Sequence, residues 1–503
     1  MTSRRHFLRS TAAVGSLAAL GDLAFLGKLR PVSADEAKLP SNLVRLQSDI
    51  EPLVRLLEET PRAKLLEEVG GRVKKGLGYR DLLAALMLAG VRNIQPRPAV
   101  GFKFHAVLVV NSAHLASLNS PDQHRWLPLF WAMDNFKSSQ AKNQEEGGWR
   151  MAAPAEAKVP PARKVKRAFV EAMDNWDEEA ADTAAAGLAR AAGRNECFEL
   201  FARYGCRDYR DIGHKAIFVA NAFRTLDAIG WRHAEPVLRS LAYALLKHEG
   251  DNPAKRAGGP DLPGRANQKR VGLFPDGWLE GKADSGATTA LLETLREASS
   301  DDVCGKVVEQ IGKGVSPSSV WDALFLGAGE LLMRQPGIVG LHTLTTANAL
   351  RYAYDTSGDD STRRMLLLQC AAFLPLFRND MKGRGKIGEV KIDAMEPMLP
   401  PGEIFPPEKV FDEVGKNRET AAQMALTYLK GTGDAKGLID LARVLIFLKG
   451  TDSHDYKFSM ATLEDYAHVS PPWRDRFFAA STYWLKGSGA KDSDLVKRVR
   501  AAL

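Results

Sequence analysis

The stretch Phe104-His105-Ala-Val-Leu-Val-Val-Asn111-Ser112 returns later in the chain, in altered form, as Leu341-His342-Thr-Leu-Thr-Thr-Ala-Asn348-Ala349. In both copies an asparagine follows the histidine by six residues. The identical tetrapeptide Leu-Pro-Leu-Phe follows each copy, at 127–130 and 374–377. Self-similarity at long period indicates a chain that folds as two like halves.

A second histidine motif is repeated in the same order. Asp211-Ile-Gly-His214-Lys215 pairs with Asp452-Ser-His454-Asp-Tyr-Lys457, with one gap. His105 and His214 are 109 residues apart, and His342 and His454 are 112 residues apart. This similar spacing predicts that the four histidines occupy equivalent places in two halves and meet in a shared cavity. The alternative is that each is an ordinary hydrogen-bonded core residue.

Helical periodicity dominates the chain, because apolar residues recur at three- and four-residue spacing. The segments with this pattern are 43–69, 79–89, 164–192, 214–247, 288–312, 318–333, 347–376 and 420–448. Pro52, Pro61 and Pro236 should split or kink their segments, since proline removes a backbone donor. Only 107–110 resembles a strand. We therefore predict an all-α fold, a duplicated helical bundle or solenoid-like array with pseudo-two-fold halves around a central histidine-lined cavity.

Three long stretches interrupt the helical pattern, at 137–163, 250–287 and 378–416. Loops of this length inside a compact protein tend to be lids, rims or linkers. They are either plain surface insertions or, if the histidines line a cavity, its walls.

The N-terminal residues resemble a twin-arginine export signal. Ser3-Arg4-Arg5-His6-Phe7-Leu8-Arg9 precedes a mildly apolar stretch and then Val32-Ser33-Ala34, which ends in small residues. This order predicts cleavage after Ala34 and export to the periplasm or the extracellular space. Such signals resemble those of proteins exported already folded, often around a cofactor. The alternative is a coincidentally basic N-terminal segment.

Beyond the predicted signal (1–34), we expect an N-terminal helical half at 35–285 and a C-terminal one at 286–503. Residues 1–34 carry five basic and one acidic side chain, so the net charge falls from +8 to about +4 without them. That charge is too small to indicate a nucleic-acid partner. No other stretch reaches about 18 uninterrupted apolar residues, so we expect no transmembrane span.

The four cysteines form no Cys-X-X-Cys pair, which argues against zinc ribbons and redox motifs. They are Cys197, Cys206, Cys304 and Cys370. We expect all four to be buried small hydrophobic residues.

Imidazole suits both metal binding and catalysis, because its neutral nitrogen ligates iron, copper or zinc and the free group titrates near neutrality. The candidate catalytic and metal-binding residues are therefore His105, His214, His342 and His454. Polar residues at fixed spacing from these histidines are candidates for holding a cofactor: Asn111, Asn221, Asn348, Asp211 and Asp452. An aspartate beside an imidazole can fix its tautomer. The competing interpretations are helix clamps for the asparagines and helix caps for the aspartates.

Four motifs follow one another: His105 with His114, Gly213-His214-Lys-Ala-Ile217, Leu341-His342-Thr-Leu-Thr345 to Ala349-Leu350, and Asp452 to Lys457. Their order resembles the questin oxidase-like family over most of the chain after residue 34. The resemblance implies an all-helical oxidoreductase; the family's namesake opens an anthraquinone ring by a Baeyer-Villiger-type oxygen insertion with a reduced nicotinamide cofactor.

This chain departs from that family in its predicted export, because nicotinamide cofactors are not expected outside the cytoplasm. Gly383-Arg-Gly385-Lys-Ile-Gly388 matches the letters of a dinucleotide fingerprint but lacks a clear strand before it and a helix after it. Substrate and electron donor therefore stay open, and an electron-transfer partner is one option.

Two hypotheses follow. The first is an exported questin oxidase-like oxidoreductase that uses the four histidines, with a transition metal such as iron or copper, on an aromatic or other small organic substrate. The second is a non-catalytic helical-repeat scaffold or binding protein of the cell envelope. The scaffold predicts imidazoles that lie far apart or are separately hydrogen-bonded. The motifs of zincins, serine hydrolases, P-loop nucleotidases and c-type cytochromes are absent from the sequence.

Overall fold

The computed structural model describes residues 42–400 and 402–503. In this part of the chain the regular elements are the α-helices α2 to α23 and short 3-10 turns, with two isolated β-bridges and no strand. The predicted all-α fold is confirmed. The predicted twin-arginine signal, residues 1–34, lies outside the described residues.

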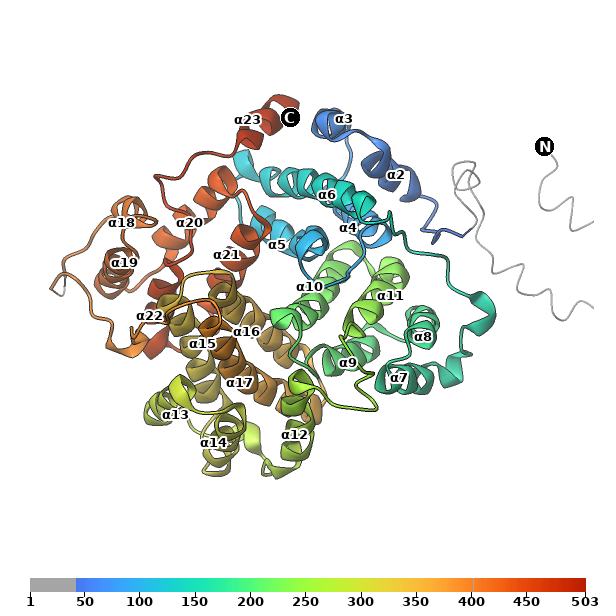
Figure 1. The fold of residues 1–503 in the computed structure, drawn as a ribbon. Coiled ribbons are helices and arrows are strands. Elements are labelled where there is room, and N and C mark those ends of the chain that lie inside the picture. The colour runs from blue at the N-terminus through green and yellow to red at the C-terminus, as the bar shows by residue number, and fades with distance from the viewer. Residues whose placement is uncertain (1–41, 401) are drawn as a thin grey trace, which may run out of the picture.

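Four helices form a bundle at the centre of the molecule: α5 (His105–Leu118), α10 (His214–Ile229), α16 (Ile338–Thr356) and α21 (Ser453–Asp465). Each packs against two of the others, in the cyclic order α5, α10, α16, α21. Figure 1 shows them in the middle of the ribbon, with the remaining helices around them. Every residue of 105–113 in α5 is buried, as expected for a helix covered on all sides.

Nine helices of the predicted first half surround α5 and α10. They are α2 (Glu51–Glu59), α3 (Arg62–Lys74), α4 (Tyr79–Asn93), α6 (Leu127–Glu145), α7 (Val165–Asn175), α8 (Glu178–Ala191), α9 (Arg194–Gly205), α11 (Ala234–Leu245) and α12 (Leu262–Arg270). In direct contact with the two bundle helices are α4, α6, α9 and α11.

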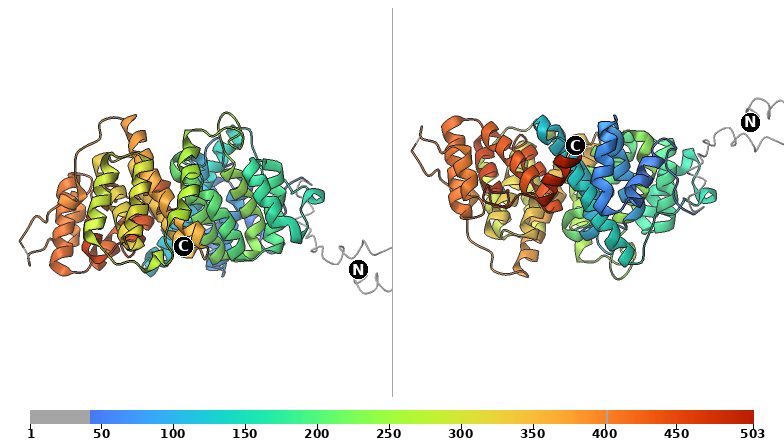
Figure 2. Two further views of the ribbon diagram at one scale, coloured as in Figure 1. Left: turned by 90° about the horizontal axis from the view of Figure 1, so that it is seen from below. Right: turned by 90° about the horizontal axis from the view of Figure 1, so that it is seen from above.

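The second half supplies the other outer helices. They are α13 (Ser285–Glu297), α14 (Ser300–Gly312), α15 (Pro317–Arg334), α17 (Asp360–Lys382), α18 (Pro407–Glu413), α19 (Arg418–Thr432), α20 (Lys436–Lys449), α22 (Pro471–Ser481) and α23 (Asp494–Ala502). Figure 2 shows the two halves side by side along the long direction of the molecule. The last helix, α23, returns to pack on α3 of the first half.

Most of the long predicted helical segments are each two helices. The segment 43–69 breaks at Pro61, as predicted. The segment 214–247 breaks instead at Gly230, whose φ is 105°, and Pro236 lies in the first turn of α11, where its missing N–H costs little. The strand-like run 107–110 belongs to α5, because burial between helices overrides the strand preference of valine.

The two Leu-Pro-Leu-Phe tetrapeptides occupy different positions in their helices. Residues 127–130 begin α6, whereas 374–377 lie inside α17, with Pro375 within the helix. The internal duplication thus stays a prediction, and so does the division at 285.

Burial and hydropathy agree with two further predictions. All four cysteines are buried and unpaired. None of the helices in residues 42–400 and 402–503 is long and apolar enough to cross a bilayer.

Candidate metal centre

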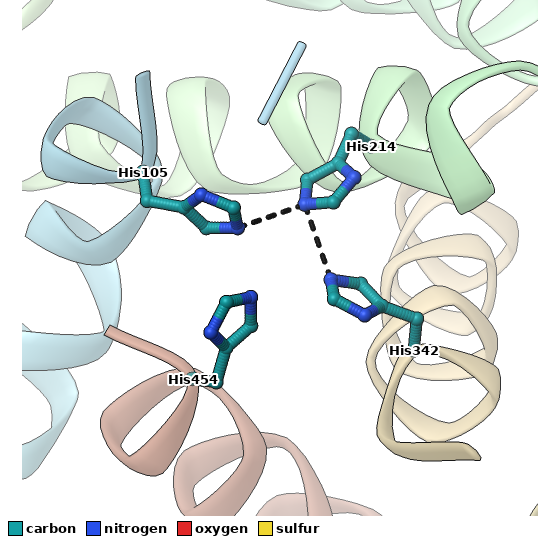
Figure 3. Close-up of side chains that lie close together, drawn as sticks. All are labelled: His105, His214, His342 and His454. Atoms are coloured by element: carbon teal, nitrogen blue, oxygen red, sulfur yellow. Dashed lines mark hydrogen bonds between the residues drawn. The ribbon is translucent and has the colours of Figure 1, made fainter. Parts of the chain in front are cut away.

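The four predicted histidines meet at one end of the central bundle. Nε2 of His214 lies 3.0 Å from Nε2 of His105 and 3.1 Å from Nε2 of His342. One ring nitrogen from each of the three and from His454 lies within 4.8 Å of all the others. Figure 3 shows the four rings, each from a different helix, pointing toward a common centre. Four buried or nearly buried histidines are therefore placed where they could bind one metal ion.

The imidazoles stand in a ring that follows the chain order. Centroids of neighbouring rings are 4.8 Å apart for His105 and His214, 4.5 Å for His214 and His342, 5.1 Å for His342 and His454, and 4.4 Å for His454 and His105. His105 and His342, which the first sequence repeat relates, face each other across the ring at 6.4 Å. A two-fold relation would place them so, but so would any ring of four helices in chain order.

Each imidazole is oriented through Nδ1 by an oxygen that can only accept a hydrogen bond. The partners are the backbone carbonyls of Phe102, Asp211 and Ile338, which serve His105, His214 and His342, and the carboxylate of Asp452, which serves His454. Because these oxygens have no proton to give, Nδ1 must carry the proton in all four rings. In a neutral imidazole Nε2 is then a bare acceptor.

The rings of His105, His214 and His342 stay neutral at neutral pH. Burial lowers the pKa of His105, His214 and His342 well below 6.5, and positive charge from Lys457 and from neighbouring imidazoles adds to the effect. The Nε2 contacts of 3.0 and 3.1 Å therefore join two acceptors rather than a donor and an acceptor. Nε2 of His454 is buried without a hydrogen-bond partner. The site thus brings one nitrogen of each of four imidazoles together, and an oxygen holds the Nδ1 atom of each ring, as is typical of metal-binding histidines.

Strained backbone holds two of the accepting carbonyls. Phe102, Asp211 and Ile212 have φ angles of 48°, 51° and 47°, in the left-handed region that residues other than glycine rarely occupy. The carbonyls of Phe102 and Asp211 are those that accept from His105 and His214. Strain of this kind persists only where the surrounding structure fixes it, and it clusters at functional sites.

Two glycines allow the close approach of these turns. Gly213 has a φ of 82°, and a Cβ there would lie 2.1 Å from Oγ1 of Thr346 in the adjacent helix. A Cβ on Gly101 would lie 3.4 Å from a ring carbon of His214 and 3.5 Å from one of His105. The turns before α5 and α10 are thus packed directly against the imidazoles.

All four bundle helices begin at the ring. His105 and His214 are the first residues of α5 and α10, His454 is the second of α21, and His342 lies in the second turn of α16. Because the N-terminus of an α-helix carries partial positive charge, the four helix ends disfavour protonation of the imidazoles. They would also stabilise an anionic group bound beside a metal.

A cavity of about 1110 Å³ covers the same face of the ring. Its walls include Phe102, whose side chain is 73% exposed, together with parts of two long stretches predicted as insertions or walls. Gly258 and Pro260 come from one of these stretches, and Asp380 and Arg384 from the other. The stretch 137–163 supplies no lining residue, and its first part belongs to α6. The volume suits a small organic molecule.

The opposite face of the ring is closed by buried polar groups. Lys457 follows His454 by one turn on α21, is 3% exposed, and its Nζ has no hydrogen-bond partner. Burial lowers the pKa of Lys457 to about 7. Lys457 belongs to the repeated motif of His454, and the spacing of three residues places both side chains on the same face of α21.

The three predicted asparagines lie beyond Lys457, around a cavity of about 20 Å³, which has room for one water molecule. Nδ2 of Asn111 donates to Oδ1 of Asn221 at 3.3 Å, and Nδ2 of Asn348 donates to Glu464 at 2.7 Å and to Asp465 at 2.9 Å. Because a helix rises about 1.5 Å per residue, an asparagine six or seven residues after a histidine lies about 9 to 10.5 Å from it along the helix axis. These contacts join the bundle helices, as in the helix-clamp interpretation, and none of them involves an imidazole.

The two predicted aspartates differ. Asp452 contacts Nδ1 of His454, which lowers the pKa of Asp452, and it also caps α21 by accepting from the backbone N–H of His454 at 2.7 Å. The carboxylate of Asp211 instead accepts from the N–H of Val100 at 2.9 Å and from Nζ of Lys247 at 3.2 Å. Only its backbone carbonyl contacts an imidazole.

Comparison of the chain with protein-family models, with curated proteins and with solved structures found no match. The function is therefore inferred from the site itself. Its geometry differs from what the scaffold hypothesis predicts, since the four imidazoles lie together rather than apart.

Proposed function

We propose that this protein is a metal-dependent oxidoreductase, with one iron or copper ion held by Nε2 of His105, His214, His342 and His454. The observation that carries the proposal is the convergence of four Nε2 lone pairs whose rings all have Nδ1 bound to an acceptor oxygen. A buried acceptor without a donor costs about 1–3 kcal/mol, and here several face one another. A cation at the centre removes that cost.

The donor set favours a first-row transition metal. Four imidazole nitrogens without carboxylate or thiolate suit iron, copper or nickel better than magnesium, calcium or an iron–sulfur cluster. Zinc prefers a tetrahedron, in which all nitrogens are about 3.3 Å apart. In a square arrangement with bonds of about 2.1 Å, adjacent nitrogens are about 3.0 Å apart and opposite ones about 4.2 Å. The contacts of 3.0 and 3.1 Å are compatible with either arrangement, and the four nitrogens lie within 4.8 Å of one another.

Redox chemistry on a small organic molecule is supported by three further features. The cavity of about 1110 Å³ opens on the face of the ring away from Lys457. An ion held by these imidazoles could also accept a ligand from the cavity side. The order of the histidine motifs resembles the questin oxidase-like family, and a twin-arginine signal is consistent with a cofactor bound before export. We propose an aromatic or related small substrate on this basis.

Elemental analysis and a visible absorption spectrum of the purified protein test the proposal. We expect about one iron or copper per chain, and oxygen consumption with at least some members of a panel of phenols and quinols. A folded protein that contains no transition metal and takes up neither Fe(II) nor Cu(II) would rule out the metal site and favour the scaffold hypothesis.

A further inference from the structure

The four histidines are not equivalent. The Nε2 atoms of His105, His214 and His342 form a connected set with separations of 3.0 and 3.1 Å, whereas Nε2 of His454 has no such contact. Figure 3 shows the two short separations and the fourth ring standing without one. Three nitrogens are therefore already spaced as ligands of one ion, and the fourth is outside this set.

The histidines also differ in how firmly their rings are held. His105, His214 and His342 are 8%, 3% and 0% exposed, and backbone carbonyls fix their Nδ1 atoms. The side chain of His454 is 16% exposed. The carbonyls of Phe102 and Asp211 lie in packed turns and that of Ile338 lies in α16. None of them can move without its backbone segment, so the fold holds these three rings in place.

His454 is held by a side chain instead. Its Nδ1 contacts the carboxylate of Asp452, which is 62% exposed and has its own rotatable bonds. Oδ1 of Asp452 also accepts the backbone N–H of His454 at 2.7 Å, so turning the ring of His454 breaks only side-chain hydrogen bonds and leaves the backbone of α21 in place. Asp452, Ser453 and His454 all line the large cavity, so the ring has space on that side.

We infer that His105, His214 and His342 form the permanent metal-binding set and that His454 is a displaceable fourth ligand. This inference rests on the proposed metal site. When His454 turns away, it frees one binding position at the cavity, where a group of the substrate or another small ligand of nitrogen, oxygen or anionic type can bind.

Metal binding by matched alanine variants tests this inference. For His454→Ala we expect about one metal per chain, with an affinity reduced by roughly 10- to 100-fold, the range seen when a supporting interaction of a metal site is lost. For His342→Ala, and equally for His105→Ala, we expect no retained metal. Circular dichroism and thermal melting identify variants that fail to fold, and having two control positions keeps the comparison available if one fails.

Imidazole added to metal-loaded His454→Ala provides a second readout. It should fill the freed position and shift the visible or electron paramagnetic resonance spectrum saturably, which it should not do in metal-free His342→Ala. The inference is overturned if folded His454→Ala loses its metal as completely as the controls, or if it retains metal without responding to imidazole. A wild-type protein that binds no metal would instead overturn the proposed function, so the two failures are distinguishable.

Discussion

Replacing His342 with leucine should affect the stability of the metal-free protein and that of the metal-bound protein differently. His342 is fully buried and its Nε2 lies 3.1 Å from that of His214. The substitution removes one of the crowded acceptors and roughly conserves volume. In the metal-free protein, relief of an unpaired acceptor is worth about 1–3 kcal/mol, and a swap of similar volume costs less than about 1.5 kcal/mol. We therefore expect the free energy of unfolding to rise by up to about 3 kcal/mol, or to fall by no more than about 1.5 kcal/mol.

With metal present the same variant should behave very differently from the wild type. A ligand at 1,000 times its dissociation constant stabilises the folded state by about 4 kcal/mol, and the variant should lose that gain. Urea unfolding with chelator measures the stability of the metal-free protein, and urea unfolding with added Fe(II) or Cu(II) measures the stabilisation by metal. The reasoning is refuted if wild type and His342→Leu respond equally to metal, or if the variant is destabilised by well over 3 kcal/mol in chelator, as expected for a group that the metal-free fold requires.

Three further predictions follow from the same geometry. The pKa values of His105, His214 and His342 are lower in the folded than in the unfolded chain, so the unfolded state binds more protons below pH 6.5. The free energy of unfolding of the metal-free protein should therefore fall as the pH decreases through 6.5, and it should fall by less in His342→Leu. Urea titrations at pH 7 and 5.5 measure this difference. Gly213→Ala places a Cβ 2.1 Å from Thr346 and should abolish metal binding or folding, whereas Gly433→Ala, with positive φ but open space, should cost only about 1 kcal/mol in thermal melts. The pKa of Lys457 is lowered to about 7, so wild-type stability should rise from pH 7 to 10, and Lys457→Met should remove that rise; equal pH profiles would show that the amine is solvated.

Much of the fold follows from local pattern, and the errors have local causes. Apolar spacing identified eight helical segments but not their ends, because two helices joined by a short turn keep the same periodicity across the break. The predicted segments leave out the helices α5, α6, α9, α12, α18, α21, α22 and α23, and α12 and α18 lie within stretches predicted as interruptions. Gly230 ends α10 through a positive φ that the sequence does not distinguish from other glycines. The helix α5 was missed because its residues are buried on all sides, so it has no polar face to give a helical period.

The candidate site was predictable where a histidine carried a repeated context. His105, His214, His342 and His454 were found in this way, and the structure brings them together. Most of the oxygens that fix their Nδ1 atoms could not be predicted, because every residue has a backbone carbonyl and the sequence does not show which carbonyl accepts a hydrogen bond. Asp211 shows the limit: the residue was selected for its carboxylate, yet its strained carbonyl is what contacts His214.

Anomalous X-ray scattering from crystals of the metal-loaded protein tests the central claim most directly. Data collected on both sides of the iron and copper absorption edges should show one peak, about 2.0 to 2.2 Å from Nε2 of His105, His214 and His342, and near His454. Density for a water or no density at this position, in crystals grown with excess metal, would contradict the claim that these lone pairs converge to hold a cation.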